Sequence, residues 1–289
     1  MAAVLTAPRA TAGKTRQIRG RRNYVGGLLA WLWLAVIILP IYYAVVTTFK
    51  DQGAYFTQNP LAPPSPPTMT AYQQVLDSGI GRYFLNSVIV TVGSVVPIVL
   101  VSFLAAYAIV RGNSRFLRFS RALFLMGLAI PLQATIIPIY LIITRIQMYD
   151  TLGALILPSI AFGIPLTVLI LSNFLRDVPR ELFESMRLDG CSDWQMAWKL
   201  AFPLVRPAIV TVSIYNGLNV WNGFLFPLIL TQSPDLRVMP LALWAFQGEY
   251  SVNIPAVLAA VVLSTLPILV LYVVGRRQLL SGLTAGFGK

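Results

Sequence analysis

The stretch RDVPRELFESMRLDGCSDWQMAWKLAFPLVR, residues 176–206, decides the fold, because it places charged side chains between two long uncharged runs. Pro179 suits the first turn of a helix, where the N–H that proline lacks would have no partner. We predict a short helix from there to about Leu188. It should end at Asp189-Gly190, because glycine readily adopts the left-handed backbone that ends many helices.

A second short helix is predicted directly after this turn. Ser192 and Gln195 have the spacing of a capping box, in which each residue satisfies a free backbone N–H of the first turn. This helix should end before Pro203, and its apolar side chains share one stripe: Trp194, Ala197, Trp198 and Ala201. Two short helices at an angle would form a projecting knob, and "the knob" denotes residues 176–206 below.

Six apolar runs surround the knob along the chain. They cover residues 24–49, 83–110, 122–143, 151–175, 207–230 and 251–274, and none contains Asp, Glu, Lys or Arg. A membrane-spanning helix needs about 20 such residues. Apolar residues make up 57% of the 289-residue chain and charged residues 11%, against about 25% charged in soluble domains. We therefore predict an all-α integral membrane protein with six transmembrane helices.

The basic residues predict how the chain is oriented. All but four of the 22 Lys and Arg residues lie in the two tails, in the second connection or in the knob; the exceptions are Lys50, Arg82, Arg145 and Arg237. Because cytoplasmic segments carry the excess of basic residues, both termini should be cytoplasmic. The predicted organisation is a basic tail (1–23), a membrane domain (24–274) that includes the knob, and a second tail (275–289). The net charge of +12 lies beside apolar runs, which indicates a lipid membrane as partner and no nucleic acid.

The chain contains no recognisable source of energy for transport. It has no histidine and one cysteine, Cys191, so we predict no catalytic residue, no metal site and no disulfide. Gly13-Lys14-Thr15 lacks the earlier glycine of a phosphate-binding loop. The six runs also lack the ionisable groups that ion-driven carriers place inside their spans. Transport would therefore be either passive, as in a channel, or driven by another subunit that acts through the knob.

At the knob the sequence resembles a known signature. Glu184-Ser185-Met186, three residues, Gly190, nine residues and Leu200-Ala201-Phe202-Pro203 resemble the EAA signature of ABC importer permeases, which reads Glu-Ala-Ala, three residues, Gly, nine residues, Ile-x-Leu-Pro. Ser185 and Met186 replace the two alanines of that signature. The resemblance implies that the knob docks on a cytoplasmic ATPase through Glu184, Ser185, Met186, Asp189, Gly190, Leu200 and Pro203.

Similarity to carbohydrate importers extends along most of the chain. Asn86-Ser87 and residues 219–224 and 282–286 look like the six-span permeases of the maltose type, with the type I importer fold. The resemblance implies a transport subunit of a bacterial or archaeal cytoplasmic membrane rather than an enzyme. Its expected partners are a second homologous permease, an external sugar-binding protein and two cytoplasmic ATPases. Those ATPases would bind ATP and Mg²⁺, so no cofactor is expected in this chain.

The fifth run offers candidate residues for a sugar pathway. Tyr215, Asn219, Asn222 and Phe226 share one helical face, with Asn216 at its edge and Trp221 pointing away. Amides exchange hydrogen bonds with sugar hydroxyls, and aromatic rings cover the apolar faces of sugars. In the third run, Gln133 lies between two prolines and is a further candidate. Hydrogen bonding between packed membrane helices is the alternative role for these amides.

Two outer loops and the transported solute leave alternatives open. The loop around Pro60 to Pro67 should be extended, as either a stiff spacer or a docking surface for an external partner. The loop at 231–250 carries Leu241, Leu243, Trp244 and Phe246, which suit an interfacial aromatic belt or the same docking surface. The solute could also be a glycerophosphate or a polyol, and the particular sugar does not follow from the sequence.

Overall fold

The computed structural model describes residues 24–242 and 252–285, which are mainly helical. The chain divides into two compact units, residues 1–42 and 43–289. The helix α1 (Tyr24–Thr47) makes up the described part of the first unit and continues into the second. Its mean hydropathy of 2.3 confirms the first predicted span as one apolar helix.

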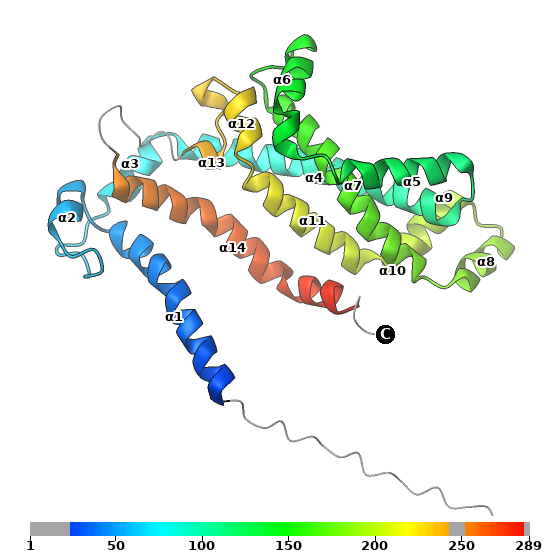
Figure 1. Ribbon diagram of the computed structural model, residues 1–289, viewed down its shortest axis with the longest axis horizontal. Coiled ribbons are helices and arrows are strands. Elements are labelled where there is room, and N and C mark those ends of the chain that lie inside the picture. Colours follow the sequence, from blue (N-terminus) through cyan, green and yellow to red (C-terminus); the bar gives the residue numbers. More distant parts are fainter. Residues whose placement is uncertain (1–23, 243–251, 286–289) are drawn as a thin grey trace, which may run out of the picture. The chain divides into compact units, whose positions relative to one another are not determined.

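Further helices follow in the second unit (Figure 1). In chain order they are α2 (Gln52–Thr57), α3 (Thr70–Asp77), α4 (Ile80–Arg111), α5 (Arg115–Gly127), η1 (Leu132–Thr135), α6 (Ile136–Arg145), α7 (Leu152–Arg176), α8 (Arg180–Leu188), α9 (Asp193–Met196), η2 (Ala197–Ala201), α10 (Phe202–Leu204), α11 (Arg206–Trp221), α12 (Leu225–Leu230), η3 (Pro234–Leu236), α13 (Met239–Ala242) and α14 (Ile254–Ala285).

The second and fourth predicted spans are confirmed as the long helices α4 and α7, with ends within three residues of the prediction. Together with α1 they are the three described helices that are each long and apolar enough to cross a membrane. The helix α14 contains the apolar stretch Ile254–Val270 and continues to Ala285, beyond the predicted end at 274. Its predicted start, Ser251, lies outside the described residues.

The third and fifth predicted spans are each interrupted and do not form one continuous helix. The third run bends by 100° between α5 and the segment Leu132–Arg145, and Pro131 lies at the break with an extended backbone. Proline also pushes the residue before it out of the helical conformation, so a helix cannot run unbroken through residues 130 and 131. The fifth run ends its first helix at Trp221 and starts α12 at Leu225. The structure has two bent pairs of apolar helices, α5 with Leu132–Arg145 and, bent by 76°, Asp193–Leu204 with α11. If each pair is one span, the described residues contain up to five spans.

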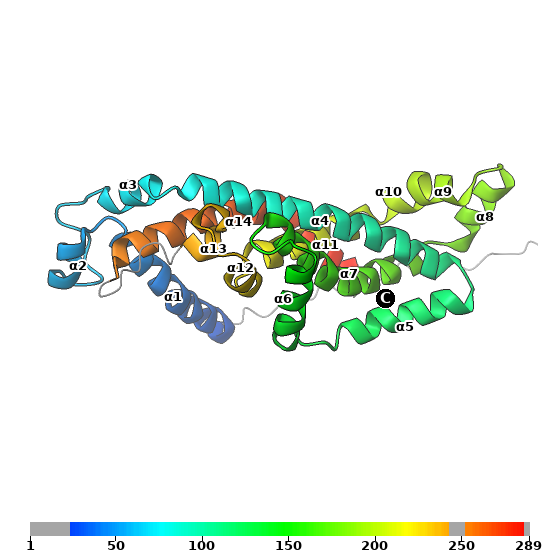
Figure 2. The same cartoon turned by 90° about the horizontal axis from the view of Figure 1, so that it is seen from above.

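The core of the second unit lies between α4, α7, α11 and α14. The helix α4 packs along α7, and α11 packs against both α4 and α14 (Figures 1 and 2). Buried apolar side chains form three clusters, around Phe103 and Leu171, around Val75 and Ala259, and around Val90 and Leu230. Among the described helices, only α4 contributes buried side chains to all three clusters.

The proline-rich connection is folded around a buried lysine. Lys50 is only 1% exposed, and its Nζ donates to the carbonyl oxygens of Asn59 at 2.8 Å and of Pro60 at 3.4 Å. Residues 58–69 form no helix, as predicted, although α2 and α3 flank them. In the other outer loop Leu241 is buried, whereas Leu243, Trp244 and Phe246 lie outside the described residues.

Candidate functional site

The first helix of the knob has one buried and one exposed side. Phe183 is 1% exposed and packs into the cluster around Phe103. On the other side, Glu184 and Ser185 are exposed, and the Ser185 hydroxyl donates only to the backbone of its own helix. The first helix of the knob therefore presents a short polar face to the outside, and the buried Phe183 ring holds its other side against the cluster around Phe103.

The turn after α8 has the hydrogen bonds of a Schellman motif. The Cys191 N–H donates to the Met186 carbonyl at 3.0 Å, and the Gly190 N–H donates to the Arg187 carbonyl at 3.1 Å. Gly190 has a φ of +80°, in the left-handed region that glycine adopts without strain. The predicted end of this helix and the reason for its glycine are both confirmed.

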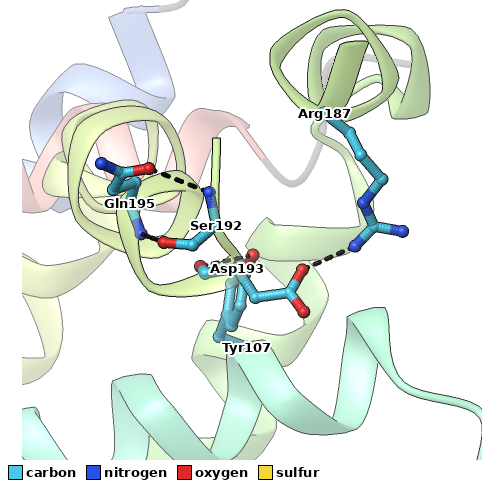
Figure 3. Close-up of polar contacts among 5 residues, drawn as sticks. All are labelled: Tyr107, Arg187, Ser192, Asp193 and Gln195. Carbon is cyan, nitrogen blue, oxygen red and sulfur yellow. Dashed lines mark hydrogen bonds and ion pairs between the residues drawn. The ribbon is translucent and has the colours of Figure 1, made fainter. Parts of the chain in front are cut away.

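The second helix begins with the predicted capping box. The Ser192 N–H donates to the Gln195 side chain at 2.9 Å, and the Gln195 N–H donates to the Ser192 hydroxyl at 3.3 Å (Figure 3). The prediction that this helix ends before Pro203 is wrong, because α10 continues to Leu204. The π-helical turn η2 precedes it, with the Phe202 N–H bonded to the Ala197 carbonyl. This wider turn carries the helix past Pro203, which has no N–H to donate.

One contact inside the knob and two from α4 hold the two short helices in place. Arg187 and Asp193 form an ion pair of 2.6 Å, and the Tyr107 hydroxyl on α4 donates to the Asp193 carbonyl oxygen at 3.2 Å (Figure 3). The ion pair is largely exposed, so its own contribution to stability is small. The Arg111 guanidinium lies 3.9 Å from the centre of the Phe183 ring, a cation–π contact. Sequence reasoning missed Tyr107 and Arg111, because nothing local relates α4 to a segment some 80 residues later.

All seven predicted coupling residues lie in the knob, but they differ in exposure. Met186 and Leu200 are half-buried and pack against the cluster around Phe103. The others are exposed: Glu184, Ser185, Asp189, Gly190 and Pro203. A protein that docks on the knob would therefore touch these five exposed residues before it touches Met186 or Leu200.

A pocket of about 330 Å³ lies between α4, α7, α11 and α12. Four of the predicted pathway residues line it: Tyr215, Asn216, Asn219 and Phe226. Ser159 and Phe162 of α7 line it as well, and the rings of Phe162 and Phe226 are 5.9 Å apart. Pockets of this size that combine apolar walls with a few polar groups are typical of small-molecule sites.

The two amides in the pocket have different surroundings. Asn216 is 4% exposed, and its Nδ2 donates to the Thr167 hydroxyl of α7 at 2.9 Å and to the Val212 carbonyl at 2.8 Å. It therefore bridges two helices as well as bordering the pocket. Asn219 is exposed, and its Nδ2 donates to the Tyr215 carbonyl of its own helix at 2.8 Å. Of the two, Asn219 has the amide that a bound solute could reach.

Two predicted pathway residues are not among the described residues that line this pocket. Gln133 is exposed in η1, although its neighbour Leu132 borders the pocket. Asn222 is the C-cap of α11, and its amide donates to the Leu218 carbonyl. Trp221 points away from the pathway face, as predicted, and is 8% exposed. Its Nε1 donates to the Ser264 carbonyl of α14 at 3.2 Å.

A segment that follows α12, residues 231–239, is held by contacts at both ends, and "the arm" denotes these residues below. At its start, the Asp150 carboxylate accepts hydrogen bonds from the Gln232 N–H at 2.8 Å, the Ser233 N–H at 3.0 Å and the Ser233 hydroxyl. The Ser233 hydroxyl, followed by the two backbone N–H groups, lowers the pKa of the Asp150 carboxyl. Asp150 therefore holds the arm as a charged carboxylate.

We expect acid to release the arm. Because the pKa of Asp150 is lowered on folding, its stabilising contribution is present above the ordinary carboxyl pKa. It is lost as the pH falls below that value and through the lower pKa of the folded state. Cleavage of the arm by an acid protease should rise as the pH is lowered from about 5 to about 3, the range around the ordinary carboxyl pKa. Asp150→Asn should remove that pH dependence; an unchanged profile in this variant would assign the titration to another group.

The chain is similar in sequence to known proteins. Residues 98–279 match the family model described as the binding-protein-dependent transport system inner membrane component. A putative ABC transporter permease of Caldicellulosiruptor sp. is 38% identical over 88% of this chain and 93% of its own length. The diacetylchitobiose uptake system permease NgcG of Streptomyces coelicolor is 30% identical over 88% of this chain and 85% of its own length.

A solved structure agrees with the sequence relatives. The crystal structure of a bacterial ABC transporter involved in the import of alginate superimposes with a TM-score of 0.78, with 20% identity over 88% of this chain and 95% of that one. At that identity the match concerns the fold alone, and it confirms the predicted type I importer fold. The family match covers the knob and, apart from Val90, the residues that line the pocket. It agrees with the family that the knob's sequence resembles. The chain is therefore a multi-pass membrane permease that belongs to the family of binding-protein-dependent transport system inner membrane components.

Proposed function

We propose that this chain is one permease subunit of an ATP-driven, binding-protein-dependent carbohydrate importer. It would form half of the translocation pathway beside a second, homologous permease. Two cytoplasmic ATPases would hold ATP and Mg²⁺, so this chain itself would need no cofactor. An external sugar-binding protein would deliver the solute, and both termini would lie in the cytoplasm.

The pocket carries the carbohydrate part of the proposal. It combines an exposed amide, Asn219, with the aromatic side chains of Tyr215, Phe162 and Phe226. Such a set suits a sugar, because amides pair with hydroxyl groups and aromatic rings cover the apolar sugar faces. The relative named for diacetylchitobiose uptake supports the same class of solute.

The exposed face of the knob supports docking on an ATPase. Glu184, Ser185 and Asp189 are exposed around a turn whose geometry is fixed by Gly190. The buried side of the same helices packs onto α4, α7 and α11, which also build the core next to the pocket. A displacement of the knob would therefore act on the helices that line the pathway.

The proposed solute class can be tested by uptake in a strain that lacks the gene. A panel of labelled maltose, cellobiose, diacetylchitobiose and arabino-oligosaccharides is compared with glycerol 3-phosphate and a polyol. We expect ATP-dependent uptake of at least one carbohydrate to disappear in the deletion strain and to return on complementation. Loss of glycerol 3-phosphate or polyol uptake alone would overturn the carbohydrate assignment, and uptake that persists without ATP would indicate a passive channel.

Docking can be tested without any solute. In a Cys191→Ala background, Ser185→Cys on the exposed side of α8 should crosslink to the ATPase with a short reagent that joins this thiol to a lysine amine of the ATPase. The same change at Ser65, an exposed position in the proline-rich connection, should not crosslink. Equal yields from both positions would contradict the assignment of the knob and of the cytoplasmic side.

A further inference from the structure

The helix α4 connects the two ends of the second unit. Its 32 residues correspond to a length of about 48 Å. Pro97 leaves one backbone hydrogen bond of α4 unmade in the middle. The next residue, Ile98, is fully buried against Gly163 of α7, where an added Cβ would lie 2.5 Å from the Ile98 side chain. Close packing thus supports α4 at the one point where its own hydrogen bonding is interrupted.

One end of α4 holds the arm through buried polar groups. Asn86 is 7% exposed, and its Nδ2 donates to the carbonyl oxygens of Asp235 at 2.8 Å and Arg237 at 2.9 Å. The Ser87 hydroxyl accepts from the Met239 N–H at 2.8 Å. These three bonds fix the backbone of the arm to a single turn of α4. Because the side chains of Asn86 and Ser87 are buried, breaking these bonds would leave their polar groups unpaired away from water.

The other end of α4 holds the knob. Tyr107 bonds to the Asp193 backbone and Arg111 covers the Phe183 ring, as described above. Phe103, which is fully buried, packs against Trp198 and Phe202 with ring centres 5.4 and 5.3 Å apart. The same helix therefore contacts both halves of the knob, α8 and the segment α9–α10. In Figures 1 and 2 the knob and α13, which begins at the last residue of the arm, lie toward opposite ends of α4.

We propose that α4 is a rigid link that makes the arm and the knob move together, with Asn86 and Ser87 as positioning residues at one end and Tyr107 and Arg111 at the other. This rests on the proposed function: the arm belongs to a predicted outer loop, which would put it on the side of the external binding protein, and the knob would face the ATPase. Hydrogen bonds and packing transmit displacement along a helix better than along a loop, because its backbone is internally bonded and supported on several sides. Occupancy of the binding protein would thus reach the ATPase through α4.

The test uses the complete importer in lipid nanodiscs, assembled with its partner permease and ATPases. ATP hydrolysis is measured alone and with the binding protein loaded with the panel sugar that the cell takes up fastest. The stimulation ratio should exceed about fivefold in the parent, the lower end of usual coupling factors. Asn86→Leu and Arg111→Gln should bring this ratio close to one, while the basal hydrolysis rate and the amount of assembled complex stay normal. Arg111→Lys should keep most of the stimulation, because it retains a cation over the ring.

Matched controls exist at both ends of α4. Arg82 forms an exposed ion pair with Asp235 of the arm, and Arg115 is an exposed cation of the same cytoplasmic connection as Arg111. Arg82→Gln and Arg115→Gln should therefore keep the parental ratio. A parental ratio in Asn86→Leu or Arg111→Gln, or a fall in assembly that accounts for the whole loss, would overturn the rigid link. A parent complex that binds the ATPase but shows no stimulation by any loaded binding protein would contradict the proposed function, and this proposal with it.

Discussion

Gly190→Val should lower uptake by about 5- to 30-fold without removing the protein from the membrane. Gly190 has a φ of +80°, and this backbone costs other residues about 1–2 kcal/mol, an energy that corresponds to that factor in population. Space is not the reason, because a Cβ at this position would have no neighbouring atom within 4 Å. The strain would be relieved by opening the Schellman turn, and α8 would then leave the orientation in which it meets the ATPase.

The measurement pairs uptake with the Ser185→Cys crosslink. Both should fall together in Gly190→Val, because the variant misplaces the docking helix rather than the pathway. Gly190→Asn is the matched control, since asparagine tolerates the left-handed backbone better than other side chains, and it should remain close to the parent. Normal uptake in Gly190→Val would show that the turn's geometry does not matter for coupling.

The knob could be predicted from sequence because its signals are local. A proline, a glycine and a Ser–Gln pair act within one helical turn, so their spacing determines where the two helices begin and end. The one local error concerns Pro203, where the π-helical turn η2 lets the helix continue. A wider turn of this kind depends on how the segment packs onto α4 and α7, which sequence spacing does not contain.

The bent spans and the supports of the knob could not be predicted in this way. Hydropathy shows that residues 122–143 and 207–230 are apolar. It carries no information on the direction of the helix axis, because a helix can end and a new one start in another direction inside one apolar run. The contacts of Tyr107, Arg111 and Asn86 join residues far apart in the chain. For Asn216 the type of residue was informative but the role was not, because an amide that lines a pocket and one that bridges two helices look the same in sequence.

The second large effect is expected at Asn219, whose amide lines the pocket without bridging two helices. Asn219→Leu should lower uptake by about 5- to 150-fold, because a solute hydroxyl left without its partner in the pocket costs about 1–3 kcal/mol. The complex should assemble normally, since the amide of Asn219 bonds only within α11 among the described residues. Phe226→Ala should share this phenotype, because its ring faces Phe162 across the pocket wall.

Three variants separate the pathway from the packing. Asn222→Leu makes the same change one turn further on, outside the residues that line the pocket, and should transport normally. Asn216→Leu should instead reduce the amount of assembled complex, because it removes the bond to Thr167 between α11 and α7. Trp221→Ala should do the same, since its ring packs on Phe84 and its Nε1 bonds to α14. Uptake measured per assembled complex distinguishes these outcomes. If Asn219→Leu lowered assembly as Asn216→Leu and Trp221→Ala do, or if it transported normally as Asn222→Leu does, the pocket would not be part of the pathway.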